Sequence, residues 1–231
     1  MTAAVCWRHN HCGDTMLDKT GDLPKIDERY VVTSLEQLAE LYGERMPTSV
    51  RKEIDHINEH YRKLIEASPF VAIATGCEEG FDCSPKGDAP GFVRVVDEKT
   101  LMIPDRPGNN RIDGFRNILR NPNIGLLFLI PGVGETMRVN GTAKLSGDPA
   151  LRESFAVGGK PARSALIVLV ASAYFHCTKS IMRSKLWDPK TQIDRNSLPS
   201  TGTIIATMTN GEHGGEQYDR EAPERHKAQL Y

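Results

Sequence analysis

The hydrophobic positions along this 231-residue chain change their period near residue 69. Upstream of that point they recur at helical steps. Ser34 and Gln37 form a capping box at the start of SLEQLAELY and Gly43 follows it, which predicts a helix over 35–42. A second helix is predicted between residues 47 and 68 from an apolar stripe at Val50, Ile54, Ile57, Tyr61, Leu64 and Ile65.

Downstream, β-branched and apolar runs are separated by Gly, Pro, Asn and Asp, which is typical of strands. A short helix with a buried edge at Ile112, Phe115 and Leu119 interrupts them and ends at Asn121-Pro122. Few helices lie between the strands, so the pattern favours a mainly β (α+β) protein built on a small, closed antiparallel barrel. The six predicted strands cover residues 70–75, 91–96, 100–104, 124–130, 135–145 and 164–175.

The polar ends of the chain suggest three regions. Residues 1–33 are predicted to be an N-terminal extension, residues 34–190 a barrel domain with its N-terminal helices, and residues 191–231 a C-terminal tail. That tail is polar and rich in glycine, so we expect a tail or an arm exchanged with a partner rather than core.

Charge and hydropathy narrow the functional classes. The formal net charge is −1, which argues against a broad nucleic-acid or membrane-binding surface, although a local basic pocket remains compatible with it. The longest apolar runs are too short to cross a bilayer. The N-terminus does not show a basic segment followed by an apolar core, so we expect a cytoplasmic protein.

Five cysteines, an odd number, indicate reduced thiols. The segment CWRHNHC at 6–12 places two Cys and two His close together, and these are zinc-type ligands. The spacing matches no common zinc finger, however, and leaves little chain to wrap around a tetrahedral ion. We therefore interpret it as a mobile polar segment and predict no metal site.

The loop IPDRPGNNR, followed by a short helix, has the composition of a phosphate cradle. Arg106 and Arg111 can bind phosphate in forked geometry, and Asn109 and Asn110 can donate amide hydrogens. Gly108 permits a close approach of the backbone, and the helix start adds free N–H groups. The alternative is a surface turn whose arginines pair with Asp105 and Asp113.

Two further polar segments are candidates. In DCSPKGDAPG (82–91), Ser84, Lys86 and Asp88 alternate and would share one face of a strand, unless the segment is an ordinary solvated hairpin. In FHCTKSIMRSKLWDP (175–189), Lys185 and Trp187 combine a cation with an aromatic ring that could stack on a planar ligand. The alternative there is a solvated basic segment with Trp187 in the core.

The run IPDRPGNNRIDGFRNILRNPNIGLLFLIPGVGETMRVNGTA resembles the pyridoxamine 5'-phosphate oxidase-like proteins with an FMN-binding split barrel. It is most similar to the bacterial subgroup described as probable FMN-dependent enzymes. The resemblance extends from about residue 67 to residue 189. It implies a six-stranded split barrel with flanking helices, and a homodimer that holds FMN at the subunit interface.

The same resemblance assigns site residues. The phosphate-gripping position falls on Asn110 and Arg111, with Asn109 beside them, where the oxidase proper has Ser-Arg-Lys. One cation is therefore missing, and Lys86 or Arg106 would supply the charge. The contacts to the edge of the isoalloxazine ring map near Ile103, Pro104 and Asp105, with Ser84 and Lys86 on the neighbouring strand. Lys185 and Trp187 resemble residues that complete the pocket from the partner chain.

The resemblance implies an FMN-dependent oxidoreductase that acts on an unidentified small molecule, with NAD(P)H as a candidate donor. The Arg-x-His segment that the oxidase uses for its pyridoxal substrate is absent after Trp187, so we do not expect pyridoxamine phosphate oxidation. Lys86 is the candidate cation near the flavin N1–C2 carbonyl. His176 is either a proton donor or a structural residue at a strand end. The alternatives are a non-catalytic flavin-binding or sensor protein, and a split barrel that binds haem or a deazaflavin.

Overall fold

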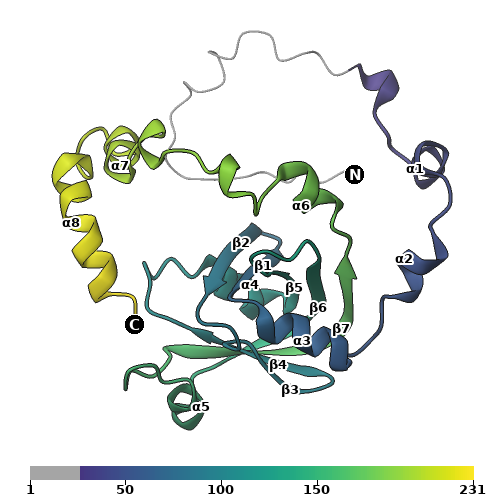
Figure 1. Ribbon diagram of the computed structural model, residues 1–231, viewed down its shortest axis with the longest axis horizontal. Coiled ribbons are helices and arrows are strands. Elements are labelled where there is room, and N and C mark those ends of the chain that lie inside the picture. The colour runs from purple at the N-terminus through teal and green to yellow at the C-terminus, as the bar shows by residue number, and fades with distance from the viewer. Residues whose placement is uncertain (1–26) are drawn as a thin grey trace. The chain divides into compact units, whose positions relative to one another are not determined.

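The computed structural model describes residues 27–231, and this part of the chain falls into two units divided after Lys52 (Figure 1). The described part of the first unit holds a short 3-10 helix, η1 (Glu28–Tyr30), and two helices, α1 (Leu35–Tyr42) and α2 (Pro47–Arg51). The predicted helix over 35–42 is confirmed together with its signals. The Ser34 hydroxyl accepts a hydrogen bond from the Gln37 amide at 3.2 Å, and Gly43 ends the helix with a positive φ of 68°.

The prediction of one helix from 47 to 68 is wrong. Helix α2 ends at Arg51, and a separate helix, α3 (Glu59–Ala67), begins after Asn58, whose side chain accepts from the Tyr61 amide at 2.8 Å. Between them, Ile54 forms a two-way backbone bridge with Ala173 in the sheet. The apolar stripe arises because Ile57, Tyr61 and Ile65 all reach the core, although an extended segment precedes the helix that carries the last two.

The second unit is built on one antiparallel sheet of seven strands, not the six predicted. Its order is β2-β1-β5-β6-β7-β4-β3, and every neighbouring pair is antiparallel. The six expected strands are all present, within a few residues of their predicted ends. The strands are β1 (Phe70–Cys77), β2 (Gly80–Gly87), β3 (Arg94–Asp97), β4 (Thr100–Asp105), β5 (Asn123–Leu129), β6 (Thr136–Ser146) and β7 (Ser164–His176).

The missed strand is β2. Its sequence, GFDCSPKG, has no run of apolar residues because β2 lies at the edge of the sheet and its inner face is polar. The edge position also tolerates Pro85, which has no N–H to donate to a ladder. Hydrophobic alternation therefore gave no signal there, and the segment was interpreted only as a strand entering a turn.

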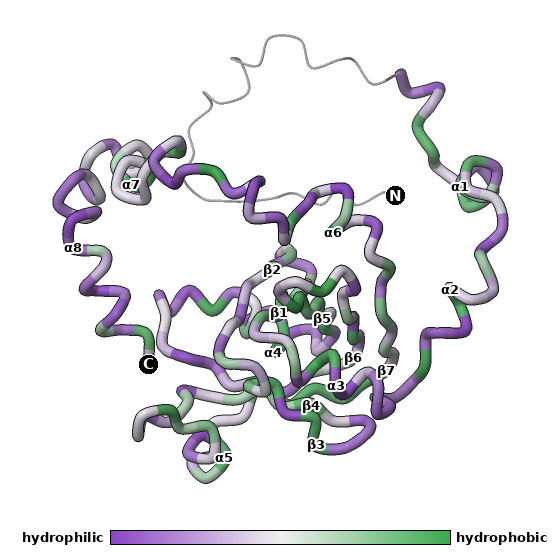
Figure 2. The backbone as a smooth tube through the Cα atoms, in the orientation of Figure 1, coloured by the Kyte–Doolittle hydropathy of each residue, from purple (hydrophilic) through white to green (hydrophobic). Residues whose placement is uncertain are grey.

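The sheet curls so that its first strand meets the end of β4. Lys86 on β2 forms an ion pair with Asp105 at the end of β4, and Asp88 pairs with Arg106 at 2.9 Å. The result is a split β-barrel with flanking helices, as the sequence predicted. Its interior is filled by the alternate apolar residues of the strands, the largest fully buried ones being Phe128, Leu101, Ile103, Leu126, Met137 and Leu166 (Figure 2).

A β-bulge interrupts the longest pairing in the sheet. Asn140 on β6 pairs with Ser172 on β7, whereas Gly141 pairs with Val170, so Ala171 is the extra residue. A Cβ atom at position 141 would overlap the carbonyl oxygen of Leu169. The bulge therefore needs glycine there.

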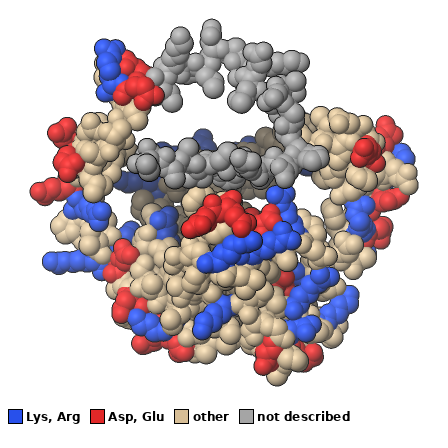
Figure 3. Space-filling view, turned by 180° about the vertical axis from the view of Figure 1, so that it is seen from behind, with Lys and Arg blue, Asp and Glu red and all other residues tan. Residues whose placement is uncertain are grey.

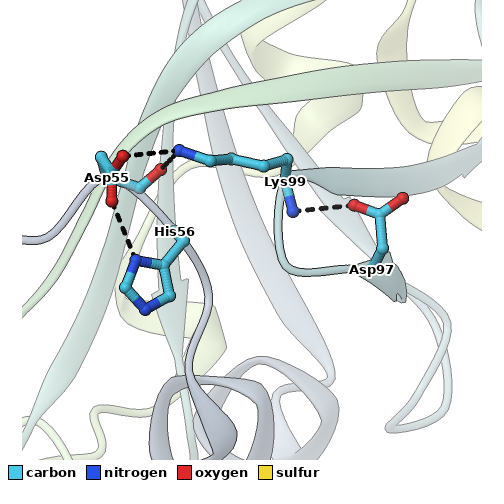
Figure 4. A network of polar contacts seen from close by, with 4 residues as sticks. All are labelled: Asp55, His56, Asp97 and Lys99. Atoms are coloured by element: carbon cyan, nitrogen blue, oxygen red, sulfur yellow. Dashed lines mark hydrogen bonds and ion pairs between the residues drawn. The ribbon is translucent and has the colours of Figure 1, made fainter.

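The segment before α3 is tied to the turn between β3 and β4 by charged groups (Figure 4). Asp55 accepts from Lys99 Nζ at 2.8 Å and contacts His56 Nδ1 at 2.9 Å. Hydrogen bonds from Lys99, and next from His56, lower the pKa of Asp55 to about 2. The Ile57 amide also donates to the Glu98 carbonyl at 2.7 Å, so the entry to α3 is fixed against this turn.

The remaining helices lie outside the barrel wall. They are α4 (Asp113–Arg120), α5 (Pro149–Ser154), α6 (Lys179–Ser184), α7 (Thr201–Met208) and α8 (Gly215–Ala228), with 3-10 turns η2 (Pro189–Thr191) and η3 (Arg195–Ser197). Helices α7 and α8 show that residues 201–208 and 215–228, expected as part of a tail, have regular structure. No helix in residues 27–231 combines the length and apolarity needed to cross a membrane. Acidic and basic side chains interleave on the face shown in Figure 3, in keeping with the net charge of −1.

Candidate functional site

A cavity of about 390 Å³ opens where the barrel is split, between β2, the end of β4 and α4. This size lies in the range of small-molecule pockets. Helix α4 covers one side of it, and the loop 106–112 forms the rim. The lining residues are Ile73, Thr75, Asp82, Ser84, Pro85, Lys86, Asp105, Arg106, Gly108, Asn109, Asn110, Arg111, Ile112, Asp113, Gly114, Phe115, Ile118 and Arg163.

The polar face of β2 forms one wall. Asp82, Ser84 and Lys86 alternate with the exposed residues Phe81, Cys83 and Pro85, and the first three line the cavity. The prediction that Ser84 and Lys86 share a strand face agrees with this register. Ser84 donates to Asp82 at 2.7 Å. Lys86 is held by its ion pair with Asp105, and its ammonium lies 5.0 Å from the centre of the Phe115 ring.

The loop 106–112 reaches α4 through two residues with left-handed backbone. Asn110 has φ 61° and Ile112 has φ 48°. Asparagine tolerates this conformation, whereas a β-branched residue adopts it only against steric strain. Ile112 is the residue immediately before α4, so this strained turn sets the direction of the helix start that lines the cavity.

Arg111 lies between these two residues and is largely exposed. Its side chain pairs with Asp113 at 2.5 Å, and this hydrogen bond, with the charge of Asp113, raises the pKa of Arg111. Its amide donates to the Asn109 side-chain oxygen at 3.0 Å. The pairing with Asp113 is the one that the surface-turn alternative described. Because Arg111 also lines the cavity, the two interpretations are compatible for this residue.

Arg106 does not form the ion pair with Asp105 that the surface-turn alternative describes. Instead of Asp105 it pairs with Asp88, and it also donates to the Phe155 carbonyl at 2.7 Å. Burial by itself raises the pKa of Asp88, but hydrogen bonds from the Ala89 amide, the Tyr231 hydroxyl and Arg106 outweigh it and leave this pKa lowered. Arg106 is thus a fixed, largely buried part of the cavity wall.

Arg163 is a cation of the site that the sequence did not reveal. It stands directly before β7, and its side chain donates to the Asn110 side-chain oxygen at 2.5 Å. Its amide donates to the Asp105 carbonyl at 2.9 Å, which continues the antiparallel pairing of β4 with β7. A correct pairing of these two strands would have brought residue 163 beside the loop. Nothing in the local sequence around Arg163 marks it.

Helix α4 lies very close to the strands beneath it. A Cβ atom on Gly114 would come within 2.8 Å of the Asp82 carboxylate, so only glycine fits without movement. Further along the helix, buried Asn117 donates to the Thr75 hydroxyl at 3.3 Å and accepts from the Cys77 thiol at 3.1 Å. These contacts seat the helix start over the inner faces of β1 and β2.

The structure places the other predicted residues outside the cavity lining. Ile103 and Pro104 are buried in β4, and their neighbour Asp105 alone of the three lines the cavity. Trp187 donates from its indole nitrogen to the Val133 carbonyl at 2.8 Å, and Lys185 is exposed just after α6. His176 is the last residue of β7 and is not a lining residue. The roles expected of Lys185 and Trp187 in a partner's site stay predictions.

The charge of the lining suits an anionic ligand with a polar body. Four cationic side chains (Lys86, Arg106, Arg111 and Arg163) face three carboxylates (Asp82, Asp105 and Asp113). At the loop, two arginines and two asparagines gather beside the start of α4, whose first-turn amides favour negative charge. Within residues 27–231 no group of three His, Cys, Asp or Glu side chains could hold a metal ion. The CWRHNHC segment lies outside the described residues.

A protein-family model described as pyridoxamine 5'-phosphate oxidase matches residues 57–177, just over half of the chain. The matched range holds the barrel strands, the loop 106–112 and α4. The chain therefore belongs to the pyridoxamine 5'-phosphate oxidase family, as its sequence indicated.

Three solved structures are similar to about half of this chain at low sequence identity. HupZ of Group A Streptococcus is 24% identical, with 49% of this chain and 89% of that chain covered and a TM-score of 0.39. A protein related to general stress protein 26 from Clostridium acetobutylicum is 18% identical, with coverages of 51% and 86% and a TM-score of 0.39. A structure named F420 reductase is 20% identical, with coverages of 52% and 98% and a TM-score of 0.38. None of the curated proteins compared with this sequence matches it.

Proposed function

We propose that this protein binds FMN in the cavity between β2, β4 and α4 and acts as an FMN-dependent oxidoreductase on a small molecule. The observation that carries the proposal is the cluster of Arg111, Arg163, Asn109 and Asn110 at the start of α4, in a chain of the pyridoxamine 5'-phosphate oxidase family. A phosphate monoester is the ligand that suits such a cluster, because it accepts forked hydrogen bonds from guanidinium groups.

The residues present fit the phosphate end of FMN. The sequence alone left one cation missing relative to the oxidase proper, and Arg163 supplies a cation beside the loop. The Arg163 side chain already donates to Asn110, and the Arg111 amide is held by the Asn109 side chain, so the loop that presents these cations is ordered before a ligand binds. Such preorganisation lowers the entropic cost of binding.

The inner part of the cavity fits a planar ring with polar edges. Ile73, Phe115 and Ile118 give it apolar surface, while Ser84 and Lys86 present a hydroxyl and an ammonium from β2. FMN supplies hydride-transfer chemistry when it is bound. In this proposal the chain itself positions the ring, and Lys86, held by Asp105, provides positive charge at its edge.

The protein is not proposed to oxidise pyridoxamine phosphate, because the Arg-x-His segment used for that substrate is absent after Trp187. The substrate is an unidentified small molecule, and NAD(P)H is a candidate electron donor. By family resemblance we also propose a homodimer that holds FMN at the subunit interface.

The phosphate role is tested by comparing FMN with riboflavin, which carries the same ring but lacks the phosphate. Arg111→Ala should weaken FMN binding by about tenfold or more, since a charge-assisted contact is lost. Riboflavin affinity should be unchanged. Titration of the protein into each flavin, followed by fluorescence, measures both constants.

Arg120→Ala is the matched control, because Arg120 is the last residue of α4, the helix that follows the Arg111 loop, pairs with Glu79 and does not line the cavity. It should bind both flavins as the wild type does. Equal FMN affinity in Arg111→Ala and wild type would refute the phosphate role. An equal loss for FMN and riboflavin would place the contact of Arg111 away from the phosphate.

The colour of the purified protein distinguishes the competing functions. Purified protein that contains oxidised flavin is yellow, and its flavin fluoresces after release. Absorbance typical of haem, or a deazaflavin in place of FMN in the extracted cofactor, would favour the corresponding alternative. Bleaching of bound flavin by a reductant such as NADH or NADPH separates an oxidoreductase from a flavin-binding sensor.

A further inference from the structure

The far end of the C-terminal arm, which we define as residues 201–231, contacts the wall of the cavity through Tyr231. The Tyr231 hydroxyl donates to Asp88 Oδ1 at 2.8 Å, and the Arg106 guanidinium lies 5.5 Å from the centre of the Tyr231 ring. The main-chain carbonyl of Tyr231 accepts from Lys160 Nζ at 2.8 Å. Three segments that are distant in sequence therefore converge on one residue, Tyr231.

The arm that carries Tyr231 is folded, because its two helices, α7 and α8, pack against each other. Asp219 on α8 accepts from the Gly202 amide at 2.7 Å and from the hydroxyl of Ser200, the N-cap of α7, at 2.5 Å, so α8 supplies a carboxylate to the start of α7. A Cβ atom on Gly202 would overlap the Gly215 carbonyl, which shows how closely the two helices approach. A movement of Tyr231 is thus coupled to this helical hairpin.

Tyr231 donates a hydrogen bond to a carboxylate, that of Asp88, which lies in a buried ion pair with Arg106. The Asp88 side chain is only 5% exposed and the Arg106 side chain 15%, so this ion pair is largely removed from water. A carboxylate at such a place needs more hydrogen bonds than one arginine provides. Oδ2 of Asp88 faces Arg106, while Oδ1 accepts from the Ala89 amide and from Tyr231. The bond to Asp88, in turn, raises the pKa of the Tyr231 phenol.

We propose that Tyr231 is a latch that fastens the C-terminal arm to the Arg106 wall of the cavity and that the docked arm slows release of the cavity's ligand. Arg106 lines the cavity, whereas Tyr231 does not, so the tyrosine acts through Arg106 and is a positioning residue. Docking shields the Asp88–Arg106 pair from water and holds the guanidinium in place. The part of the proposal that concerns ligand release rests on the proposed FMN binding.

The latch itself is tested by limited trypsin digestion of the full-length protein. Arg225 and Lys227 lie in the last turn of α8, which must unwind before trypsin can cleave there, and we expect this unwinding to become more frequent when Tyr231 is released. Tyr231→Phe removes the bond to Asp88 and keeps the ring, and Lys160→Ala removes the bond to the main chain. Each should speed cleavage at these sites by about two- to tenfold, the range expected for one net hydrogen bond.

Tyr42→Phe is the control, because Tyr42 is 80% exposed on α1 and the same hydroxyl is removed there. Its cleavage rate should equal that of the wild type. Unchanged rates in both Tyr231→Phe and Lys160→Ala would overturn the latch. This measurement needs no flavin, so it stands even if the proposed FMN binding fails.

The effect on the ligand is measured by mixing the FMN-loaded protein with excess apoflavodoxin and following FMN release. Tyr231→Phe should release FMN several-fold faster than wild type, with Tyr42→Phe unchanged. By linkage, bound FMN should slow trypsin cleavage of the wild-type arm by a similar factor. Faster cleavage with unchanged FMN release would refute the ligand-holding role of the latch.

Discussion

Ile112 has a backbone conformation that suits its side chain poorly. It is β-branched and half exposed, yet its φ is 48°, and it stands at the turn that aims α4 at the cavity. A non-glycine residue held in such a region costs of the order of 1–3 kcal/mol. The strain is located where the loop and the helix start meet the proposed phosphate, so we regard it as part of how the site is held.

Replacing Ile112 by Asn should therefore stabilise the protein. Asn adopts the left-handed conformation more readily, and the half-exposed Ile side chain loses little burial. We expect the free energy of unfolding to rise by about 0.5–1 kcal/mol, measured by chemical denaturation. Ile193→Asn, at an exposed residue that is not among those with positive φ, should not raise it. A loss of stability in Ile112→Asn would show that the turn is not strained.

At the residue scale the sequence identified part of the cavity lining. Ser84 and Lys86 are readable by residue type and spacing in one short segment and Arg111 in another, and all three line the cavity. Arg163 was missed because it reaches the loop only through the pairing of β4 with β7, a contact between positions about sixty residues apart along the chain. Side-chain chemistry can be predicted from local sequence, whereas convergence from distant strands cannot.

At the scale of the elements, the pairing of β6 with β7 depends on a glycine at its bulge. Gly141 stands at the bulge, and a methyl group there would meet the Leu169 carbonyl, which belongs to the backbone and cannot rotate away. Gly141→Ala should lower the free energy of unfolding by about 1–3 kcal/mol, measured by urea denaturation. Gly147→Ala, where an added Cβ meets nothing within 4 Å, should change it little. Equal stability of both variants would mean that the bulge relaxes without cost.

Most elements with a strong hydrophobic period were predicted well, and a strand without one was missed. The six apolar strands and α1 followed their patterns, whereas β2 has a polar inner face and was missed. The stripe from Val50 to Ile65 misled because an extended segment, bridged to Ala173 at Ile54, begins the burial that α3 continues. Periodicity reports which residues are buried, and two kinds of backbone can bury the same residues.

At the scale of the whole molecule, the sheet brings its own strands and loops to the cavity, but Lys185 and Trp187 stay outside it within one chain. If these residues complete a pocket, a second copy of the chain must supply them. The proposed homodimer can therefore be stated in terms of the residues that each chain supplies. Each site would draw its phosphate contacts from one chain and its Lys185 from the other.

We expect sedimentation equilibrium to give a mass about twice that of the 25.6 kDa chain. Lys185→Ala should weaken FMN binding, whereas Lys190→Ala, at another exposed lysine just beyond it, should not. Neither Lys185→Ala nor Arg111→Ala alone should retain normal affinity. When the two are mixed and allowed to exchange subunits, however, mixed dimers hold one intact site, and part of the tight FMN binding should return. A monomer at every concentration with flavin bound, or wild-type affinity in Lys185→Ala, would show that one chain builds the whole site.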